Sequence, residues 1–462
     1  MLTEMLSRIQ FAFTVSFHII FPAFSIGLAT FLAVLEGLWL KTKKPVYYQM
    51  CRFFTKIFAL TFGMGVVSGI IMSFQLGTNW GQYADAVGPV LGSLFTYEVL
   101  TAFFVEAGFL GIMLFGWKRV SPKMHYAATL CVFVGVTLSA FWILAANSWM
   151  QTPDGASYAG VHFHPESWAH IILNHSTIPR FFHMLISSYL ATSLAVAGIS
   201  AAYWLKNRHA DFAKTTLSLV LWFITVLAPL QLWVGDAVGR EVHTNQPIKT
   251  AAMEGVWETG TGVPFLVFAW PDQDKQTNYW SIKIPHVASL VNTHQWDGTL
   301  IGLKTVPPKD QPHVASVFFT FRIMVLCGLI FFAIAIGNIW LRCKGTLFES
   351  RRFIGLLRWT APLGFVAIEA GWMTAEIGRQ PWTVYGLLRT SHSMSILTPW
   401  HVWASLIAII CMYALMFGFF YTKYLRHILH EGPMSEETAA RMPFAYFGEG
   451  VVKANSNTGG DQ

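Results

Sequence analysis

The sequence predicts an all-α, polytopic membrane protein, and three observations lead to this prediction. Hydrophobic residues make up 54% of the 462 residues and charged residues only 12%, a balance far more apolar than that of soluble chains. Nine apolar stretches are long enough for a helix that crosses the hydrocarbon core, which takes ~20 residues. The loops between them differ sharply in positive charge, as in a multi-pass chain.

The nine predicted transmembrane helices cover approximately residues 11–40, 53–76, 94–117, 125–148, 181–206, 217–239, 316–341, 353–376 and 401–424. The first stretch is too long for the ~7–15 apolar residues of a signal peptide, and it has no small-residue cleavage site. We therefore expect it to remain as a membrane helix.

Lys and Arg gather in alternate loops. The loops after the first, third, fifth and seventh spans hold Lys41, Lys43, Lys44, Arg52, Lys56, Lys118, Arg119, Lys123, Lys206, Arg208, Lys214, Arg342, Lys344, Arg351, Arg352 and Arg358. The loop after the second span has none, and the loop after the fourth has only Arg180. The positive-inside rule places the N-terminus outside and the C-terminus inside. The net charge of +7 reflects this bias and does not indicate nucleic-acid binding.

Four regions follow from this pattern. Residues 1–240 hold helices one to six, and residues 316–430 hold helices seven to nine. Between them, residues 241–315 form an extracytoplasmic loop whose many Trp and Phe residues indicate packed structure. We expect residues 431–462 to be a mobile cytoplasmic tail.

Neither the cysteines nor the loop histidines indicate a metal site. The five cysteines are scattered without CxxC spacing, so we expect no disulfide framework and no thiolate site. Histidines at irregular spacing in a loop are more often solvated than metal-bound. Those in the outer loop after the fourth span are His162, His164, His170 and His175.

Several polar residues lie in the outer halves of the predicted spans, a depth at which ionisable residues are costly and usually functional. They are His18, Glu98, Glu106, His183, Met324 and Glu376. Some of the helices that carry these residues enter the membrane from outside, and one leaves it there. Because residues on helices that run in opposite directions share one depth, we expect them to form one site or cluster. Arg379 follows Glu376 in GWMTAEIGRQPW, and a second interpretation of this string is an anchor at the membrane surface.

Buried imidazole and thioether groups are axial ligands of haem iron, and a carboxylate can take an axial or distal position. Haem is therefore a strong candidate for this site. A single intramembrane His is more often a packing residue, however, and Met324 is one of 17 methionines.

Glu98 and Glu106 lie eight residues apart, nearly on one helix face and about 12 Å apart along the axis. Such a pair suits a proton route to an outer site, and the alternative is a pair of structural, protonated acids. Glu369 is a weaker candidate for the same role, and Trp372 is expected beside Glu376.

The chain resembles subunit I of the cytochrome bd-type quinol oxidases over nearly its full length. The motifs that carry the resemblance are RIQFAFTVSFHIIF, FQLGTNW, YEVLTAFFVEAG, LSAFWILAANSWMQ, RFFHMLISSY, KTAAMEGVWET, FRIM and GWMTAEIGRQPW. The outer loop looks like the family's Q-loop. It lacks the long insertion found in one branch of the family, so the chain is similar to the short-loop, cyanide-insensitive branch.

The resemblance implies a low-spin haem b bound by His183 and Met324, with Arg322 near its propionates or its quinol edge. It implies His18 and Glu376 as ligands of two high-spin haems, with Trp372 and Arg379 nearby.

It further implies Glu98 distal to the Glu376 centre, and Glu106 with Ser139 in the proton path. Lys249 and Glu254, in a solvent-accessible loop, would contact or deprotonate quinol.

The implied function is that of a quinol:O2 oxidoreductase in the bacterial cytoplasmic (inner) membrane. It would oxidise quinol outside and reduce O2 to water with protons from inside, without pumping. The implied cofactors are a low-spin haem b, a high-spin haem b and haem d, or a further haem b in its place. The implied partners are subunit II of the oxidase and, as a second candidate, a small single-span subunit. The rival interpretation is a proton-coupled transporter or channel without haem, which would leave the His and Met residues unexplained.

Overall fold

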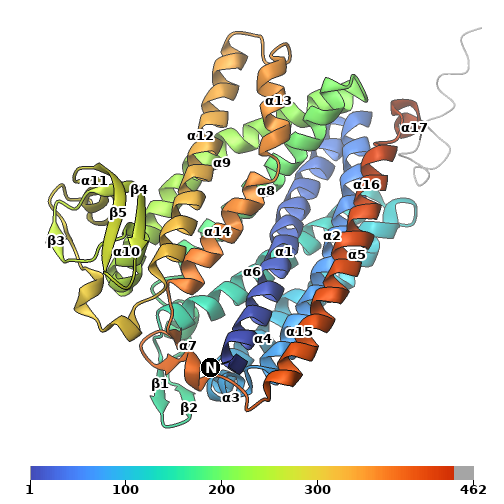
Figure 1. Ribbon diagram of the computed structural model, residues 1–462. Helices are drawn as coiled ribbons and strands as arrows, with labels where there is room; N and C mark the ends of the chain where they lie inside the picture. Colours follow the sequence, from blue (N-terminus) through green and yellow to red (C-terminus); the bar gives the residue numbers. More distant parts are fainter. Residues whose placement is uncertain (1, 442–462) are drawn as a thin grey trace, which may run out of the picture.

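A computed structural model describes residues 2–441 of the chain. Within these residues, nine helical segments are long and apolar enough to cross a membrane, which confirms the predicted number. They lie side by side in one bundle (Figure 1). The nine segments are Leu2–Thr42, Pro45–Thr78, Gly81–Lys118, Pro122–Gln151, Trp168–Leu205, Ala210–Asn245, Pro308–Cys343, Arg351–Ile377 and Pro399–Glu431.

Helix α1 (Leu2–Thr42) lies at the centre of this bundle and packs against α2 (Pro45–Thr78), α6 (Pro122–Gln151) and α8 (Thr177–Leu205). Small residues permit the close approach. A Cβ at Gly27 would collide with the Thr192 side chain of α8, so only glycine fits there.

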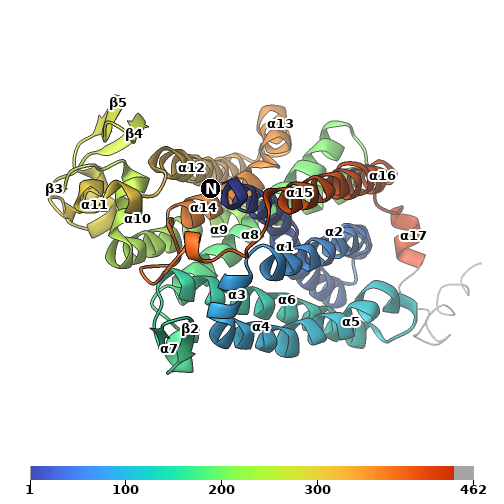
Figure 2. The ribbon, with the colours of Figure 1, turned by 60° about the horizontal axis from the view of Figure 1, so that its bottom comes forward.

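Four helices form a closed ring in which each packs against the next: α8, α9 (Ala210–Asn245), α12 (Val314–Cys343) and α14 (Leu363–Ile377). Figure 2 shows this group on one side of α1. The interior of the ring is therefore lined by side chains from four separate parts of the sequence.

Two spans contain π-helical turns, each of which rotates the following residues relative to an ideal α-helix. The third span consists of α3 (Gly81–Val87), η1 (Gly88–Gly92), α4 (Ser93–Glu98), η2 (Val99–Phe103), α5 (Phe104–Phe115) and η3 (Gly116–Lys118). The ninth consists of α15 (Pro399–Tyr413), η7 (Ala414–Tyr421) and α16 (Thr422–Glu431).

The eighth span differs from the single helix predicted over 353–376. It is divided into α13 (Arg351–Thr360) and α14, with Pro362 at the junction. Proline lacks the N–H that an unbroken helix would need at this position.

The outer loops hold the remaining elements. The loop between α9 and α12 contains α10 (Pro247–Glu254), β3 (Gly260–Thr261), β4 (Phe265–Asp272), β5 (Thr277–Ile284), α11 (Val287–Thr293), β6 (Thr299–Leu300), η4 (Leu303–Thr305) and η5 (Pro308–Asp310). The others contain β1 (Ala156–Ala159), β2 (His162–Pro165), α7 (Trp168–Ile172), β7 (Trp382–Val384), β8 (Leu388–Arg389) and η6 (Thr390–His392).

The loop between α9 and α12 packs around a buried apolar cluster, in which its residues Ala252, Trp257 and Leu303 meet Val242 of α9 and Val317 of α12. The expectation of packed structure is therefore confirmed. Antiparallel pairing joins β4 to β5 and β3 to β6.

The start of the C-terminal tail departs from the expectation of mobility. Helix α17 (Glu436–Arg441) packs on α2, and Gln49 Nε2 donates a hydrogen bond of 2.9 Å to the Met434 carbonyl. The rest of the predicted tail, residues 442–462, lies outside the described residues.

Candidate functional site

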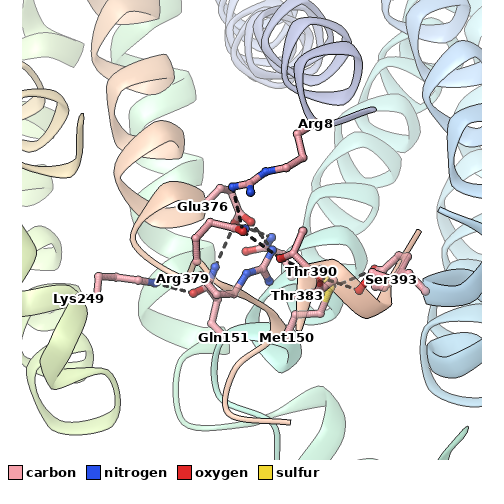
Figure 3. Close-up of polar contacts among 12 residues, drawn as sticks. Arg8, Met150, Gln151, Lys249, Glu376, Arg379, Thr383, Thr390 and Ser393 are labelled. Carbon is pink, nitrogen blue, oxygen red and sulfur yellow. Dashed lines mark hydrogen bonds and ion pairs between the residues drawn. The ribbon is translucent and has the colours of Figure 1, made fainter. Parts of the chain in front are cut away.

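Glu376, at the end of α14, accepts hydrogen bonds from two side chains of α6. Its Oε1 lies 3.0 Å from Asn147 Nδ2 and 3.0 Å from Gln151 Nε2, and its Oε2 pairs with Arg379 (Figure 3). Arg379 is only 7% exposed, so it points into the protein. This geometry favours an internal site over a surface anchor for GWMTAEIGRQPW.

Two further cations adjoin this carboxylate network. Arg180 donates to Asn147 Oδ1 at 2.6 Å, and Lys249 donates to Gln151 Oε1 at 2.5 Å. Burial, reinforced by the Arg180 charge, lowers the pKa of the Lys249 ammonium well below its usual value. Arg379 Nε and Nη1 are buried without a hydrogen-bond partner in the described chain. These unpartnered donors of Arg379 fit an added anionic group, such as the propionates of a haem.

Sequence reasoning missed Arg180, Asn147 and Gln151 as members of this site. Asn147 and Gln151 lie four residues apart, which puts them on one face of α6. Arg180 was the only cation in its outer loop. Both features were signals, but neither specified which acid these residues would meet.

His183 and Met324 lie on α8 and α12, which belong to the four-helix ring. A Cβ at Gly235 of α9 would lie 3.5 Å from His183 Nε2, and one at Gly371 of α14 would lie 3.0 Å from Met324 Sδ. Each donor atom therefore faces a position that has no side chain. Imidazole and thioether groups are axial ligands of haem iron, so both side chains have the donor type that a low-spin haem needs.

His18 is oriented by Ser68 of α2, whose Oγ lies 2.9 Å from His18 Nδ1. The Ser68 hydroxyl has one hydrogen, and backbone carbonyls accept it at 2.9 Å (Met64) and 3.0 Å (Gly65). When Ser68 donates to one of these carbonyls, it accepts from His18 Nδ1–H, and this tautomer leaves Nε2 with a free lone pair. A Cβ at Gly69 would lie 3.2 Å from His18 Cε1 and 4.0 Å from Nε2, so the ring lies beside the Gly69 backbone.

Glu98 and Glu106 both face α6, which confirms that they point to one side of their span. Ser139 Oγ donates to Glu98 Oε1 at 2.7 Å. Glu106 is 6% exposed, and a Cβ at Gly135 would lie 2.5 Å from its Cγ. Its Oε1 is buried without a partner among the described residues. Ser139 therefore contacts Glu98, whereas the resemblance grouped it with Glu106.

The expectation that Lys249 and Glu254 are solvent-accessible is wrong, since they are 2% and 1% exposed. Glu254 Oε2 pairs with Arg322 Nη2 at 3.0 Å, and its Oε1 accepts from Asn292 Nδ2 at 3.1 Å. The loop folds over its own charged residues because α10 packs between α9 and α12.

Arg322 joins α12 to this loop. Its Nε and Nη2 donate to the Leu266 carbonyl of β4 at 3.0 and 2.9 Å, and its Nη1 donates to the Met253 carbonyl. The guanidinium also lies 4.1 Å from the Phe318 ring centroid. Arg322 is thus held by the loop, and its role near a haem stays a prediction.

The remaining candidates have simpler surroundings. Trp372 packs with an apolar cluster that contains Ala191 and Ile368. Glu369 Oε1 is buried without a partner among the described residues. His162 contacts Asp85 at 3.1 Å and His170 contacts Asp154 at 3.0 Å.

No group of three or more His, Cys, Asp or Glu side chains within residues 2–441 could hold a metal ion by itself. All five cysteines, which lie in this range, are free thiols.

Comparison with known proteins agrees with this geometry. The model of the family "Cytochrome bd terminal oxidase subunit I" matches residues 6–433. Cytochrome bd-II ubiquinol oxidase subunit 1 of Escherichia coli (strain K12) is 33% identical over 480 aligned positions, with 89% of this chain and 93% of that protein covered.

Cytochrome bd ubiquinol oxidase subunit 1 of Bacillus subtilis (strain 168) is 34% identical and covers 92% of this chain and 93% of its own length. The solved structure of bd oxidase from Geobacillus thermodenitrificans superimposes with a TM-score of 0.86 at 26% identity, over 93% of this chain and 99% of that one. The chain therefore belongs to the cytochrome bd terminal oxidase subunit I family.

Proposed function

We propose that this chain is the haem-containing subunit of a terminal respiratory oxidase, a quinol:O2 oxidoreductase of the bacterial inner membrane. The nine apolar helices, the family match and the two ubiquinol oxidase relatives support this function. The observation that carries it is that the potential haem ligands lie inside the helix bundle, with His183 and Met324 on α8 and α12 of the four-helix ring and His18 hydrogen-bonded to Ser68 of α2.

Haem, when bound, supplies the one-electron transfers and the reduction of oxygen. His183 and Met324 would hold a low-spin haem b between α8 and α12. His18, through Nε2, and Glu376 would hold the two high-spin groups, namely a haem b and either haem d or a further haem b. Asn147, Gln151 and Arg379 orient the Glu376 carboxylate, as outer partners of a metal ligand do.

Quinol would react at the outer loop, where Glu254 accepts a proton and Lys249 contacts the quinol oxygen. The Arg322 guanidinium pairs with Glu254 Oε2 at 3.0 Å and so holds this carboxylate in place. Because both residues are buried, quinol reaches them only if the loop opens or through a path along the lipid-facing helices.

Protons for water formation would come from inside through Glu106 and Glu98, and Ser139 fixes the second of these acids. The oxidase needs no pump, because proton release and proton uptake occur on opposite sides of the membrane. The partners would be subunit II and a small single-span subunit, with quinol, O2 and the lipid bilayer.

A haem assay of the purified complex tests this proposal. The pyridine haemochrome spectrum should reveal bound haem, and quinol should drive oxygen uptake. A preparation that transports protons but contains no haem would establish the rival transporter function.

A further inference from the structure

The β4–β5 hairpin carries a row of exposed apolar side chains on one face. Cross-strand pairing sets Phe268 against Ile282 and Trp270 against Tyr279. These four side chains are 42%, 60%, 51% and 39% exposed. Such an exposed patch is rare on a surface that faces only water.

Irregular register produces this row. The pairing shifts between Leu266 and Phe268 and again between Phe268 and Trp270, so strict alternation of the two faces is broken. Leu266 and Ala269 turn inward, at 5% and 0% exposure, and pack against Phe318 of α12. The hairpin is therefore fixed to α12 by one set of side chains and presents another set outward.

The outward row continues onto the lipid-facing side of α12. The Phe319 ring centroid lies 5.5 Å from that of Trp270 and 6.2 Å from that of Phe268. Ile323 and Leu326, one and two turns further along α12, are 43% and 58% exposed. In a membrane helix, such an exposed apolar stripe contacts lipid chains.

The position of the hairpin matches this continuity. Both views show it at the side of the bundle, beside α12, and not over the centre of the helix ends (Figures 1 and 2). Lys275 at its tip donates to Tyr279 Oη at 3.1 Å. Trp, Tyr and Lys side chains next to an apolar stripe are typical of the membrane interface.

We propose that the β4–β5 hairpin is an interfacial anchor, whose outward row of Phe268, Trp270, Tyr279 and Ile282 inserts into the outer leaflet at the boundary of headgroups and acyl chains. The proposal does not depend on which haems the chain binds. It gives the loop that carries Lys249 and Glu254 a fixed depth in the bilayer, because Arg322 links Glu254 to the Leu266 carbonyl of the hairpin.

Site-specific fluorescence tests the depth of this row. A cysteine introduced at Ile282 (Ile282→Cys), in a chain with Cys131→Ser, Cys343→Ser and Cys411→Ser that keeps only the buried Cys51 and Cys327, would be labelled with the polarity-sensitive dye NBD. The oxidase complex would then be reconstituted in phosphatidylcholine vesicles. Lys309→Cys, which lies at an exposed position of the same loop, is the matched control.

The dye at residue 282 should emit at shorter wavelength than at residue 309. Lipids with a doxyl group near the headgroup should quench it strongly, and aqueous iodide should quench it weakly. Strong iodide quenching at residue 282 would overturn the proposal. A short-wavelength emission that doxyl lipids leave unchanged would also overturn it, because another protein chain would then cover the row.

Discussion

At the scale of single residues, the candidate ligands are distinguished by what lies opposite them. A Cβ at Gly371 would lie 3.0 Å from Met324 Sδ and one at Gly69 3.2 Å from His18 Cε1, which are tight contacts, whereas one at Gly235 would lie an ordinary 3.5 Å from His183 Nε2. The type of residue alone did not separate Met324 from the other methionines. The contact of Met324 with Gly371, inside the ring of four helices, does separate Met324 from them. This contact depends on the tertiary structure.

Because His183 and Met324 are proposed as the only axial ligands of the low-spin haem, His183→Ala or Met324→Leu should abolish the low-spin α-band of the reduced spectrum. Part of the high-spin signal should remain. Met373→Leu, at a 45% exposed position on α14, should leave the spectrum unchanged. An intact low-spin band in either ligand variant would refute the assignment.

Glu106 should be required for rapid oxygen reduction, because its separation from Glu98, about 12 Å along the helix axis, is too long for one hydrogen bond to bridge. Glu106→Leu should slow steady-state oxygen uptake strongly, and Glu106→Asp should recover part of the rate. Reduction of the low-spin haem by quinol, followed by stopped flow, should persist in both variants. Near wild-type turnover in Glu106→Leu would mean that the acid is structural or bypassed.

A Gly135→Ala variant gives an independent test of the same acid. The new methyl group would press on Glu106 Cγ, and overpacking of this kind costs about 1–3 kcal/mol. We expect slower oxygen uptake with haem spectra retained. Gly111→Ala on α5, where a Cβ meets nothing within 4 Å, is the matched control and should keep the normal rate.

At the scale of elements, the outer loop is tied to the membrane helices by the Arg322–Glu254 pair. Glu254→Gln should impair quinol oxidation, because the amide still accepts hydrogen bonds but no longer accepts the quinol proton. The haem spectra should stay intact. Glu258→Gln, at a carboxylate of the same loop that is 74% exposed and paired with Lys304, should have little effect. Equal quinol turnover in both variants would show that Glu254 is only structural.

The elements also show what the sequence could and could not predict. Apolar length predicted all nine spans, because a hydrocarbon core demands it. The break at Pro362 and the π-turn η2 were not predicted, although the proline was visible. Local deviations of this kind depend on the neighbouring helices that satisfy the freed backbone groups.

The candidate site was predicted less completely than the spans. The common depth of the polar residues predicted that Glu376 belongs to a shared site. It did not predict that Arg180 of α8 and Lys249 of the outer loop join the hydrogen-bond network around Glu376. Only the packing of α10 between α9 and α12 places Lys249 there. For the same reason, the burial of Glu254 could not be predicted from the sequence.

At the scale of the whole molecule, the charge bias of the loops predicts an orientation with the N-terminus outside and the C-terminus inside. Green fluorescent protein fused after Gln462 should fluoresce in intact bacteria, because it becomes fluorescent in the cytoplasm. Alkaline phosphatase is active only outside the cytoplasm, so a fusion after Lys309, in the outer loop, should be active. Phosphatase activity from a C-terminal fusion would reverse the proposed orientation.

This orientation determines the stoichiometry of proton movement. If quinol gives up its protons outside and oxygen takes up its protons from inside, each electron releases one proton outside, whatever the rate. Vesicles with the outer loop facing the bath should acidify it in this ratio during quinol oxidation. Glu106→Asp should lower the rate but leave the ratio unchanged, because the ratio depends on where the two half-reactions occur. A higher ratio would require a pump, and a lower one in tight vesicles would place both half-reactions on the same side.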